Sequence, residues 1–182
     1  MSPTRRLAWR RLACVGGAVA LVCAACSGNP KPVRVVPSAS NTHMIDTQGR
    51  DIGTAAMLES SSGGLLVLKL SSISPGAHGL HLHASGFCDP PGFLSADAHY
   101  NPKNRKHGTK NPQGPHAGDL PNIVARPDSV VDTNLAIPRE VLGHIGAGAA
   151  AKSLIVHAGP DDQMTDPSGN SGPRIACGVL QR

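Results

Sequence analysis

Residues 78–83 read His-Gly-Leu-His-Leu-His, and this run decides the fold prediction for the chain around it. Leucine and histidine alternate from Leu80 to His83, which is the period-two pattern of a β-strand. His81 and His83 therefore project from one face, with backbones about 6–7 Å apart, so both imidazoles can converge on one metal ion. His78 is an odd number of residues away and faces the other side, so we interpret it as structural. A surface histidine pair that binds nothing is the alternative.

Short apolar runs separated by turn residues lie on both sides of this strand. The chain has 21 glycines and 16 prolines, whereas its only aromatic residues beyond residue 41 are Phe87, Phe93 and Tyr100. A core of Val, Ile, Leu and Ala with many turn residues favours short strands over long helices. We predict an all-β sandwich or barrel of eight strands: Thr42–Asp46, Ile52–Glu59, Leu65–Ile73, Gly79–His83, Ile123–Ala125, Val130–Ile137, Ser153–His157 and Ile175–Gln181.

Two long segments, Ala84–Pro121 and Ala158–Pro173, carry no strand pattern. Loops of that length inside a compact domain are usually functional, so we expect the site to be built there. A helical turn is conceivable at Ala147–Ala151, but its glycine content favours a loop.

The first long segment holds a second set of metal-binding side chains at intervals of eight, nine and three residues: His99, His107, His116 and Asp119. Three imidazoles and a carboxylate suit tetrahedral zinc. A loop rich in glycine and proline has little apolar core, so a bound ion would order it. His157 ends a distant apolar strand and could complete the site that His81 and His83 begin. A polar surface loop without metal is the alternative.

The N-terminal segment predicts export. Four arginines precede an apolar run from Leu12 to Ala25, and no acidic residue occurs before residue 26. Fourteen apolar residues are too few for a stable membrane-spanning helix, so we interpret residues 1–25 as a signal peptide. A retained anchor helix is the alternative, and the arginine pairs leave Sec and twin-arginine export both open.

The stretch Val22-Cys23-Ala24-Ala25-Cys26-Ser27 resembles a bacterial lipobox, which implies that Cys26 is the lipidated first residue of the mature protein. Cys23 stands where such motifs usually carry an aliphatic residue, so cleavage without lipid stays open. Residues 26–41 then form the lipidated cysteine and a flexible tether rich in Pro, Ser and Asn. We therefore expect a membrane-anchored lipoprotein in the bacterial periplasm or at the cell surface.

Most of the net charge of +5 comes from the leader. Without Arg5, Arg6, Arg10 and Arg11, 13 basic residues remain against 12 acidic ones. With no basic helix and almost no aromatic side chains to stack bases, we exclude nucleic acid as a partner.

Two cysteines, Cys88 and Cys177, remain once Cys14 and Cys23 are assigned to the leader and Cys26 to the lipid. An even pair in an exported domain predicts a disulfide.

Four runs of the chain, taken in order, resemble the successive signatures of copper/zinc superoxide dismutases. They are His78-Gly79-Leu80-His81-Leu82-His83, His99-Tyr100-Asn101-Pro102, His116-Ala117-Gly118-Asp119-Leu120-Pro121-Asn122 and Gly172-Pro173-Arg174-Ile175-Ala176-Cys177-Gly178-Val179. The likeness covers residues 42–182, and the five-residue step from His83 to Cys88 is typical of bacterial members.

This resemblance implies an eight-stranded Greek-key β-barrel with two long functional loops, a fold also grouped with the sandwiches. It implies an enzyme that disproportionates superoxide to oxygen and hydrogen peroxide. Copper would be held by His81, His83, His99 and His157. Zinc would be held by His99, His107, His116 and Asp119, so that His99 bridges the two ions.

Other residues take roles from the same resemblance. Asp161 corresponds to the aspartate that hydrogen-bonds one ligand of each metal. Arg174 corresponds to the arginine beside copper, and Cys88 with Cys177 to the family disulfide. The second long loop departs from the family because it carries three aspartates and no lysine, which puts its usual guidance of substrate in doubt.

Two other classes of function compete with this one. A non-enzymatic copper-binding module would be expected to lack the bridging histidine, the zinc set or the arginine. A zinc-stabilised structural sandwich would leave His81, His83 and His157 unused. The sequence leaves a monomer and a homodimer both open.

Overall fold

The computed structural model describes residues 41–60, 63–145 and 151–180, and nine strands lie within these ranges. They are β1 (Asn41–Asp46), β2 (Asp51–Ser60), β3 (Gly63–Leu70), β4 (Gly76–His78), β5 (Leu80–His83), β6 (Ile123–Ala125), β7 (Val131–Pro138), β8 (Lys152–His157) and β9 (Arg174–Leu180). One short helix, α1 (Arg139–Leu142), follows β7. The described part contains no helix that is both long and apolar enough to cross a membrane.

The predicted leader, Cys26 and nearly all of the tether lie outside the described residues. The same holds for most of Ala147–Ala151.

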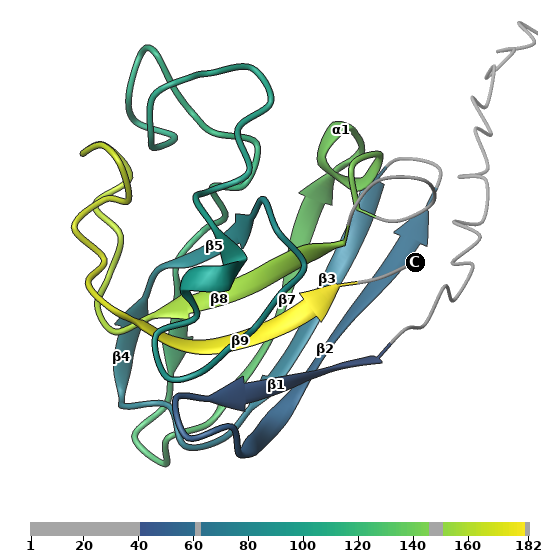
Figure 1. Cartoon of the computed structure of the whole chain (residues 1–182), viewed down its shortest axis with the longest axis vertical. Helices are drawn as coiled ribbons and strands as arrows, with labels where there is room; N and C mark the ends of the chain where they lie inside the picture. The colour runs from purple at the N-terminus through teal and green to yellow at the C-terminus, as the bar shows by residue number, and fades with distance from the viewer. Residues whose placement is uncertain (1–40, 61–62, 146–150, 181–182) are drawn as a thin grey trace, which may run out of the picture. The chain divides into compact units, whose positions relative to one another are not determined.

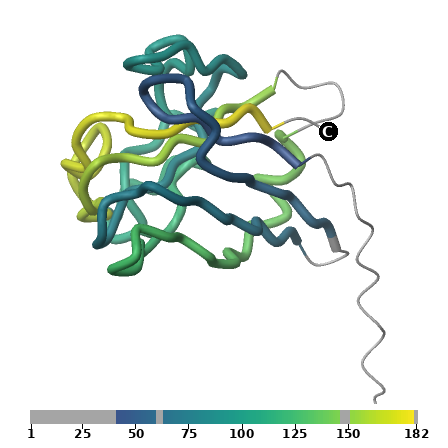
Figure 2. Tube along the Cα trace, turned by 90° about the horizontal axis from the view of Figure 1, so that it is seen from below, coloured from purple at the N-terminus to yellow at the C-terminus, as the bar shows by residue number. Residues whose placement is uncertain are grey.

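Seven of the strands form one antiparallel sheet in the order β5-β8-β9-β1-β2-β3-β7, and β4 pairs with β6 in a second sheet. Figure 1 shows how the large sheet curls, and Figure 2 shows the trace of the same strands surrounding an interior. The two long loops leave this framework and are joined to each other, since the backbone N–H of Lys110 donates to the carbonyl of Gln163 at 2.9 Å. The prediction of an all-β fold is confirmed.

All eight predicted strands occur, and most of their bounds differ from the predicted ones by one to three residues. The run Leu65–Ile73 ends as a strand at Leu70. The strand predicted over Gly79–His83 begins at Leu80, because the backbone of Gly79 pairs with the second long loop instead. Its N–H donates to the carbonyl of Gly159, and a β-carbon at Gly79 would lie 2.8 Å from that of Ser171. The ninth strand, β4, has only three residues and no alternation that sequence could reveal.

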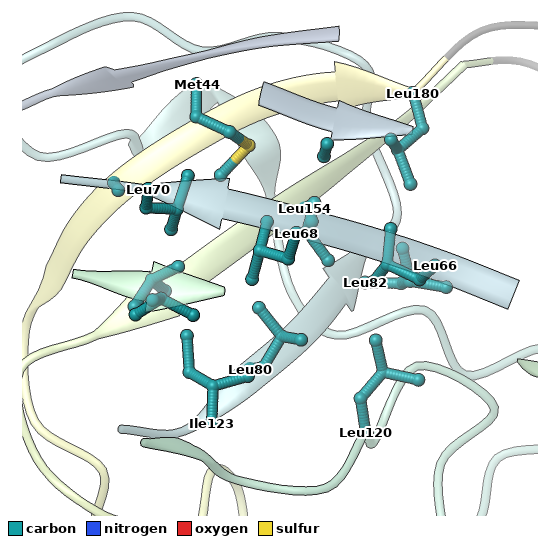
Figure 3. Close-up of a cluster of buried hydrophobic side chains, with 14 of the residues drawn as sticks. Met44, Leu66, Leu68, Leu70, Leu80, Leu82, Leu120, Ile123, Leu154 and Leu180 are labelled. Carbon is teal, nitrogen blue, oxygen red and sulfur yellow. The ribbon is translucent and has the colours of Figure 1, made fainter. Parts of the chain in front are cut away.

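The core is aliphatic and explains the alternation in β5. Leu80 and Leu82 are fully buried among aliphatic side chains, including Leu66 and Leu68 of β3. Figure 3 shows these leucines pointing toward one another beneath the ribbon. His81 and His83 point to the opposite face, where the long loops cover them so completely that they are 0% and 1% exposed. The alternative of a surface histidine pair is therefore wrong.

β5 is the edge strand of the large sheet, and the first long loop covers its outer edge. The N–H of Leu82 donates to the carbonyl of Gly118, and the carbonyl of Leu82 accepts from Tyr100. Isolated bridges join His81 to Asp119 and His83 to His99. Glycine is required at position 118, where the first long loop pairs with β5, because a β-carbon there would lie 2.2 Å from the carbonyl oxygen of Leu82.

The predicted disulfide joins Cys88 to Cys177, with Cα atoms 5.7 Å apart. Cys177 lies in β9, and Cys88 lies in the first long loop. Beside the bond, Phe93, Ala96 and Ile155 form a small buried cluster. The bond therefore ties the metal-binding loop to the strand that begins at Arg174.

Reducing this disulfide should lower the free energy of unfolding by about 2–5 kcal/mol, because the unfolded chain regains the freedom that a closed loop of roughly 90 residues denies it. Denaturant unfolding with and without reductant measures the change. A Cys88→Ser, Cys177→Ser double variant is the control and should match the reduced parent in both conditions. Two free thiols in the native exported protein would contradict the prediction.

Candidate metal centre

The seven predicted metal ligands come from three parts of the fold and meet beneath the two long loops. His81 and His83 come from β5, and His157 comes from the end of β8. The first long loop contributes the remaining four: His99, His107, His116 and Asp119. All but His99 are buried, with exposed fractions of 8% or less, and the His99 side chain is itself only 7% exposed.

Two groups of these ligands are close enough to hold an ion each. The ligand atoms of His81, His83, His99 and His157 all lie within 4.8 Å of one another. A second group with the same property consists of His81, His99, His107 and Asp119, so His81 and His99 belong to both. His116 is absent from the second group but adjoins it, because its Nδ1 lies 3.2 Å from Asp119 Oδ1.

In the first group, one nitrogen of each of three imidazoles is held by an oxygen. His83 Nδ1 donates to the carbonyl of Asp97 at 2.6 Å, and His157 Nδ1 donates to that of Gly172 at 2.8 Å. His81 Nε2 lies 2.8 Å from Asp161 Oδ2. The opposite nitrogens, His83 Nε2, His157 Nε2 and His81 Nδ1, are buried and have no hydrogen-bond partner. A buried polar atom without a partner is costly, whereas a neutral imidazole nitrogen of this kind is a metal ligand. These residues therefore fit copper.

In the second group, hydrogen bonds from backbone N–H groups orient the Asp119 carboxylate. Its Oδ2 accepts the N–H groups of Gly108 and His116 at 2.8 and 2.9 Å. Its Oδ1 faces the Nδ1 atoms of His99 and His107, each at 3.0 Å, and that of His116 at 3.2 Å. One carboxylate oxygen and three imidazole nitrogens are the donor set of tetrahedral zinc, so these residues fit that ion.

Asp161 connects the two groups. Its Oδ2 lies 2.8 Å from His81 Nε2, and its Oδ1 lies 3.0 Å from His107 Nε2. Gln163 donates its backbone N–H to one carboxylate oxygen and its side-chain amide to the other. Asn122 exchanges two hydrogen bonds with the backbone of Asp161. The sequence pointed to Asp161 but not to Gln163, which follows it in a loop without periodicity.

Burial and charge give the imidazoles different protonation states. Burial lowers the pKa of His83 to about 2 and those of His99 and His157 to about 4, so these rings are neutral near pH 7. Burial also acts to lower the pKa of His107. There, the nearby carboxylates of Asp119 and Asp161 outweigh burial and raise the pKa to about 9. His107 Nδ1 lies 3.0 Å from Asp119 Oδ1 but makes no well-aligned hydrogen bond with it.

His78 lies outside both groups. It is buried, and its ring nitrogens lie 2.8 Å from the carbonyl oxygen of His157 and 2.7 Å from that of Ser74. Its contacts agree with the structural role expected from its place in the sequence.

A cavity of about 910 Å³ opens over the first group, and its walls include His83, His99, His157 and Arg174. The Arg174 guanidinium donates to the carbonyl oxygens of Phe93 and Asp97 at 2.6 and 2.7 Å. These bonds use two of its five N–H groups, so others are available to an anion in the cavity. Burial lowers the pKa of Arg174, but an arginine stays charged at any physiological pH.

Comparison with known proteins identifies the family. Residues 52–180 match the family model of copper/zinc superoxide dismutase. The chain is 41% identical over 147 residues to a copper/zinc superoxide dismutase of Aquifex aeolicus strain VF5. The match covers 78% of this chain and 86% of the relative.

Solved structures agree with this assignment. A double mutant of a superoxide dismutase-like protein from Bacillus subtilis superposes with a TM-score of 0.72 and 36% identity, covering 78% of this chain and 97% of the other. The copper/zinc superoxide dismutase of Brucella abortus superposes with a TM-score of 0.63 and 29% identity, covering 78% of this chain and 99% of the other. The family predicted from the four sequence runs is thus confirmed, and the chain belongs to the copper/zinc superoxide dismutase family.

Proposed function

We propose that this chain is an enzyme that disproportionates superoxide to oxygen and hydrogen peroxide with one copper and one zinc ion. Copper would be held by His81, His83, His99 and His157. Zinc would be held by His99, His107, His116 and Asp119, so His99 would serve both sites. The observation that carries the proposal is the convergence of three buried, unpaired imidazole nitrogens beside His99.

Copper, when bound, supplies the one-electron chemistry that disproportionation needs, which zinc lacks. Arg174 binds the superoxide anion in the cavity, because its remaining N–H groups combine a fixed charge with hydrogen-bond donors. His99 lines the cavity beside the copper ligands, so its copper-side nitrogen, when not bound to metal, would be placed to hold a proton and pass it to the peroxide product. Asp161 keeps His81 and His107 in the orientation that leaves their Nδ1 atoms free for metal.

Metal analysis of the purified chain, together with a superoxide dismutase assay, tests this function. We expect one copper and one zinc per chain with dismutase activity. Stoichiometric metals without activity would favour a non-enzymatic copper-binding module. Zinc alone would favour a structural sandwich.

Zinc binding at pH 7 should release about one proton per ion from His107. The pKa of about 9 means that this ring is protonated before zinc binds, and a metal needs the neutral ring. Zinc affinity should therefore rise with pH until about pH 9. Calorimetric titration in buffers of different ionisation enthalpy counts the protons. A zinc-binding enthalpy that is the same in every buffer would contradict the prediction.

Export and lipidation are part of the same proposal. Residues 1–25 are a signal peptide, Cys26 carries lipid, residues 26–41 are the tether, and residues 42–182 are the enzymatic domain, which acts as a monomer or a homodimer. The disulfide supports an exported location, because such bonds persist in oxidising compartments. The enzyme would then work in the periplasm or at the cell surface, held to a membrane by its lipid.

Cys26→Ser should release active protein into the soluble fraction, because the lipid is attached outside the metal-binding domain. Fractionation and mass spectrometry of acyl groups measure the change. Cys23→Ser is a matched control, since Cys23 leaves with the signal peptide and its variant should stay membrane-bound. A parent chain without acyl groups would show that the membrane anchor is wrong.

A further inference from the structure

Asp97 has a backbone conformation that few residues other than glycine adopt. Its φ is 66° and its ψ is −158°, which lies in a region essentially restricted to glycine, and an L side chain there is strained. Hydrogen bonds on either side hold the chain in this shape. The N–H of Asp97 donates to the carbonyl of Leu94, and the carbonyl of Ala98 accepts from Ala84. The fold therefore fixes the direction of both the Asp97 carbonyl and its side chain.

The Asp97 carbonyl oxygen holds two functional groups at once. It accepts from His83 Nδ1 at 2.6 Å and from the Arg174 guanidinium at 2.7 Å. The strained backbone thereby fixes the position of His83, a proposed copper ligand, relative to Arg174, the proposed anion-binding group. Asp97 is exposed, and the charge of its carboxylate acts on that guanidinium.

We propose that the Asp97 side chain limits anion attraction at Arg174, because its carboxylate opposes part of the guanidinium's charge. The carboxyl carbon is three bonds from the carbonyl carbon, so the opposing charge lies within several ångströms of Arg174. The Asp97 charge also acts to raise the pKa of Arg174, as a nearby carboxylate should. The inference rests on the proposed role of Arg174 in binding a small anion.

Removing this charge should strengthen anion binding. A unit charge at such a distance, near the surface and in high dielectric, changes the affinity of a monovalent anion by about 2–5-fold. The effect should shrink as salt screens it. Removing the β-carbon as well should relieve strain and raise the melting temperature by about 2–6 °C, after allowance for the greater freedom of glycine in the unfolded chain.

Three variants of the metal-loaded protein test the proposal, with azide as the anion probe and the copper absorption spectrum as the readout. Asp97→Asn removes the charge and keeps the β-carbon. Asp97→Gly removes both. Asp89→Asn is the matched control, because it removes an equal charge from the same loop at an exposed position that makes no recorded interaction with Arg174.

We expect both Asp97 variants to bind azide about 2–5-fold more tightly at low salt, converging on the parent at high salt, with Asp89→Asn unchanged. Only Asp97→Gly should melt at a higher temperature. Azide affinity equal to the parent in Asp97→Asn, or an equal gain in Asp89→Asn, would overturn the role of the carboxylate. A lower melting temperature in Asp97→Gly would contradict the claim that the Asp97 side chain strains the backbone. A parent that binds azide but does not dismutate superoxide would disprove the proposed function and leave this test intact.

Discussion

Asp161→Asn should weaken zinc binding by about 10–100-fold, the usual effect of losing a hydrogen-bond partner that orients metal ligands. The Asp161 carboxylate accepts from His81 and His107 at once, while Gln163 donates to it twice. An amide has one acceptor oxygen instead of two, and its NH₂ group would face donors. His107 would lose the charge that raises its pKa and the contact that orients its ring.

Competition with a chromophoric chelator measures the zinc dissociation constant of this variant. Asp162→Asn is the matched control, because Asp162 is exposed and its carboxylate contacts loop backbone and Asn170 rather than a histidine. An unchanged zinc affinity in Asp161→Asn would show that His81 and His107 are oriented by the backbone alone.

Arg174→Glu should lower the dismutation rate more than about tenfold while both metals stay bound, since local positive potential raises the association rate of anions by roughly 10–1,000-fold. The variant places a negative charge where the cavity now offers a guanidinium. None of the seven proposed metal ligands donates to or accepts from Arg174 in the described structure, so metal content should hold. Pulse radiolysis at several salt concentrations, with metal analysis of the same sample, gives the result. A parent-like rate with copper bound would remove Arg174 from its proposed role.

The basic residues of the first long loop contribute less attraction than their number suggests. Of the four basic residues in this loop, Lys103 pairs with Glu140, and Lys106 pairs with Asp166 at 2.7 Å. Arg105 and Lys110 contact carbonyl oxygens, which leave their charges uncompensated. Neutralising Arg105 and Lys110 should therefore flatten the salt dependence of the rate more than neutralising the two paired lysines.

The sequence revealed those parts of the site where residue type and spacing are dictated by chemistry. Alternation identified the faces of β5, because a half-apolar strand needs a period of two. Spacing in the first long loop pointed to the proposed zinc set, because a bound ion accounts for so many potential ligands in a segment without an apolar core.

What escaped prediction depends on contacts between distant segments. Gly79 interrupts the predicted strand because it must pass close to Ser171, and Gln163 reaches Asp161 only through the path of its loop. The strain at Asp97 was equally invisible, since no local pattern distinguishes it from an ordinary exposed aspartate.

The seam between β5 and the first long loop has a consequence for solubility. An edge strand with free N–H and C=O groups is a template on which another chain can add a strand, and proteins commonly cover such edges. Here the covering segment, around Tyr100 and Gly118, is the same stretch that carries the proposed zinc ligands. Holding that stretch in order therefore protects the protein from self-association, so the metal-free chain is the form most exposed to intermolecular sheet growth.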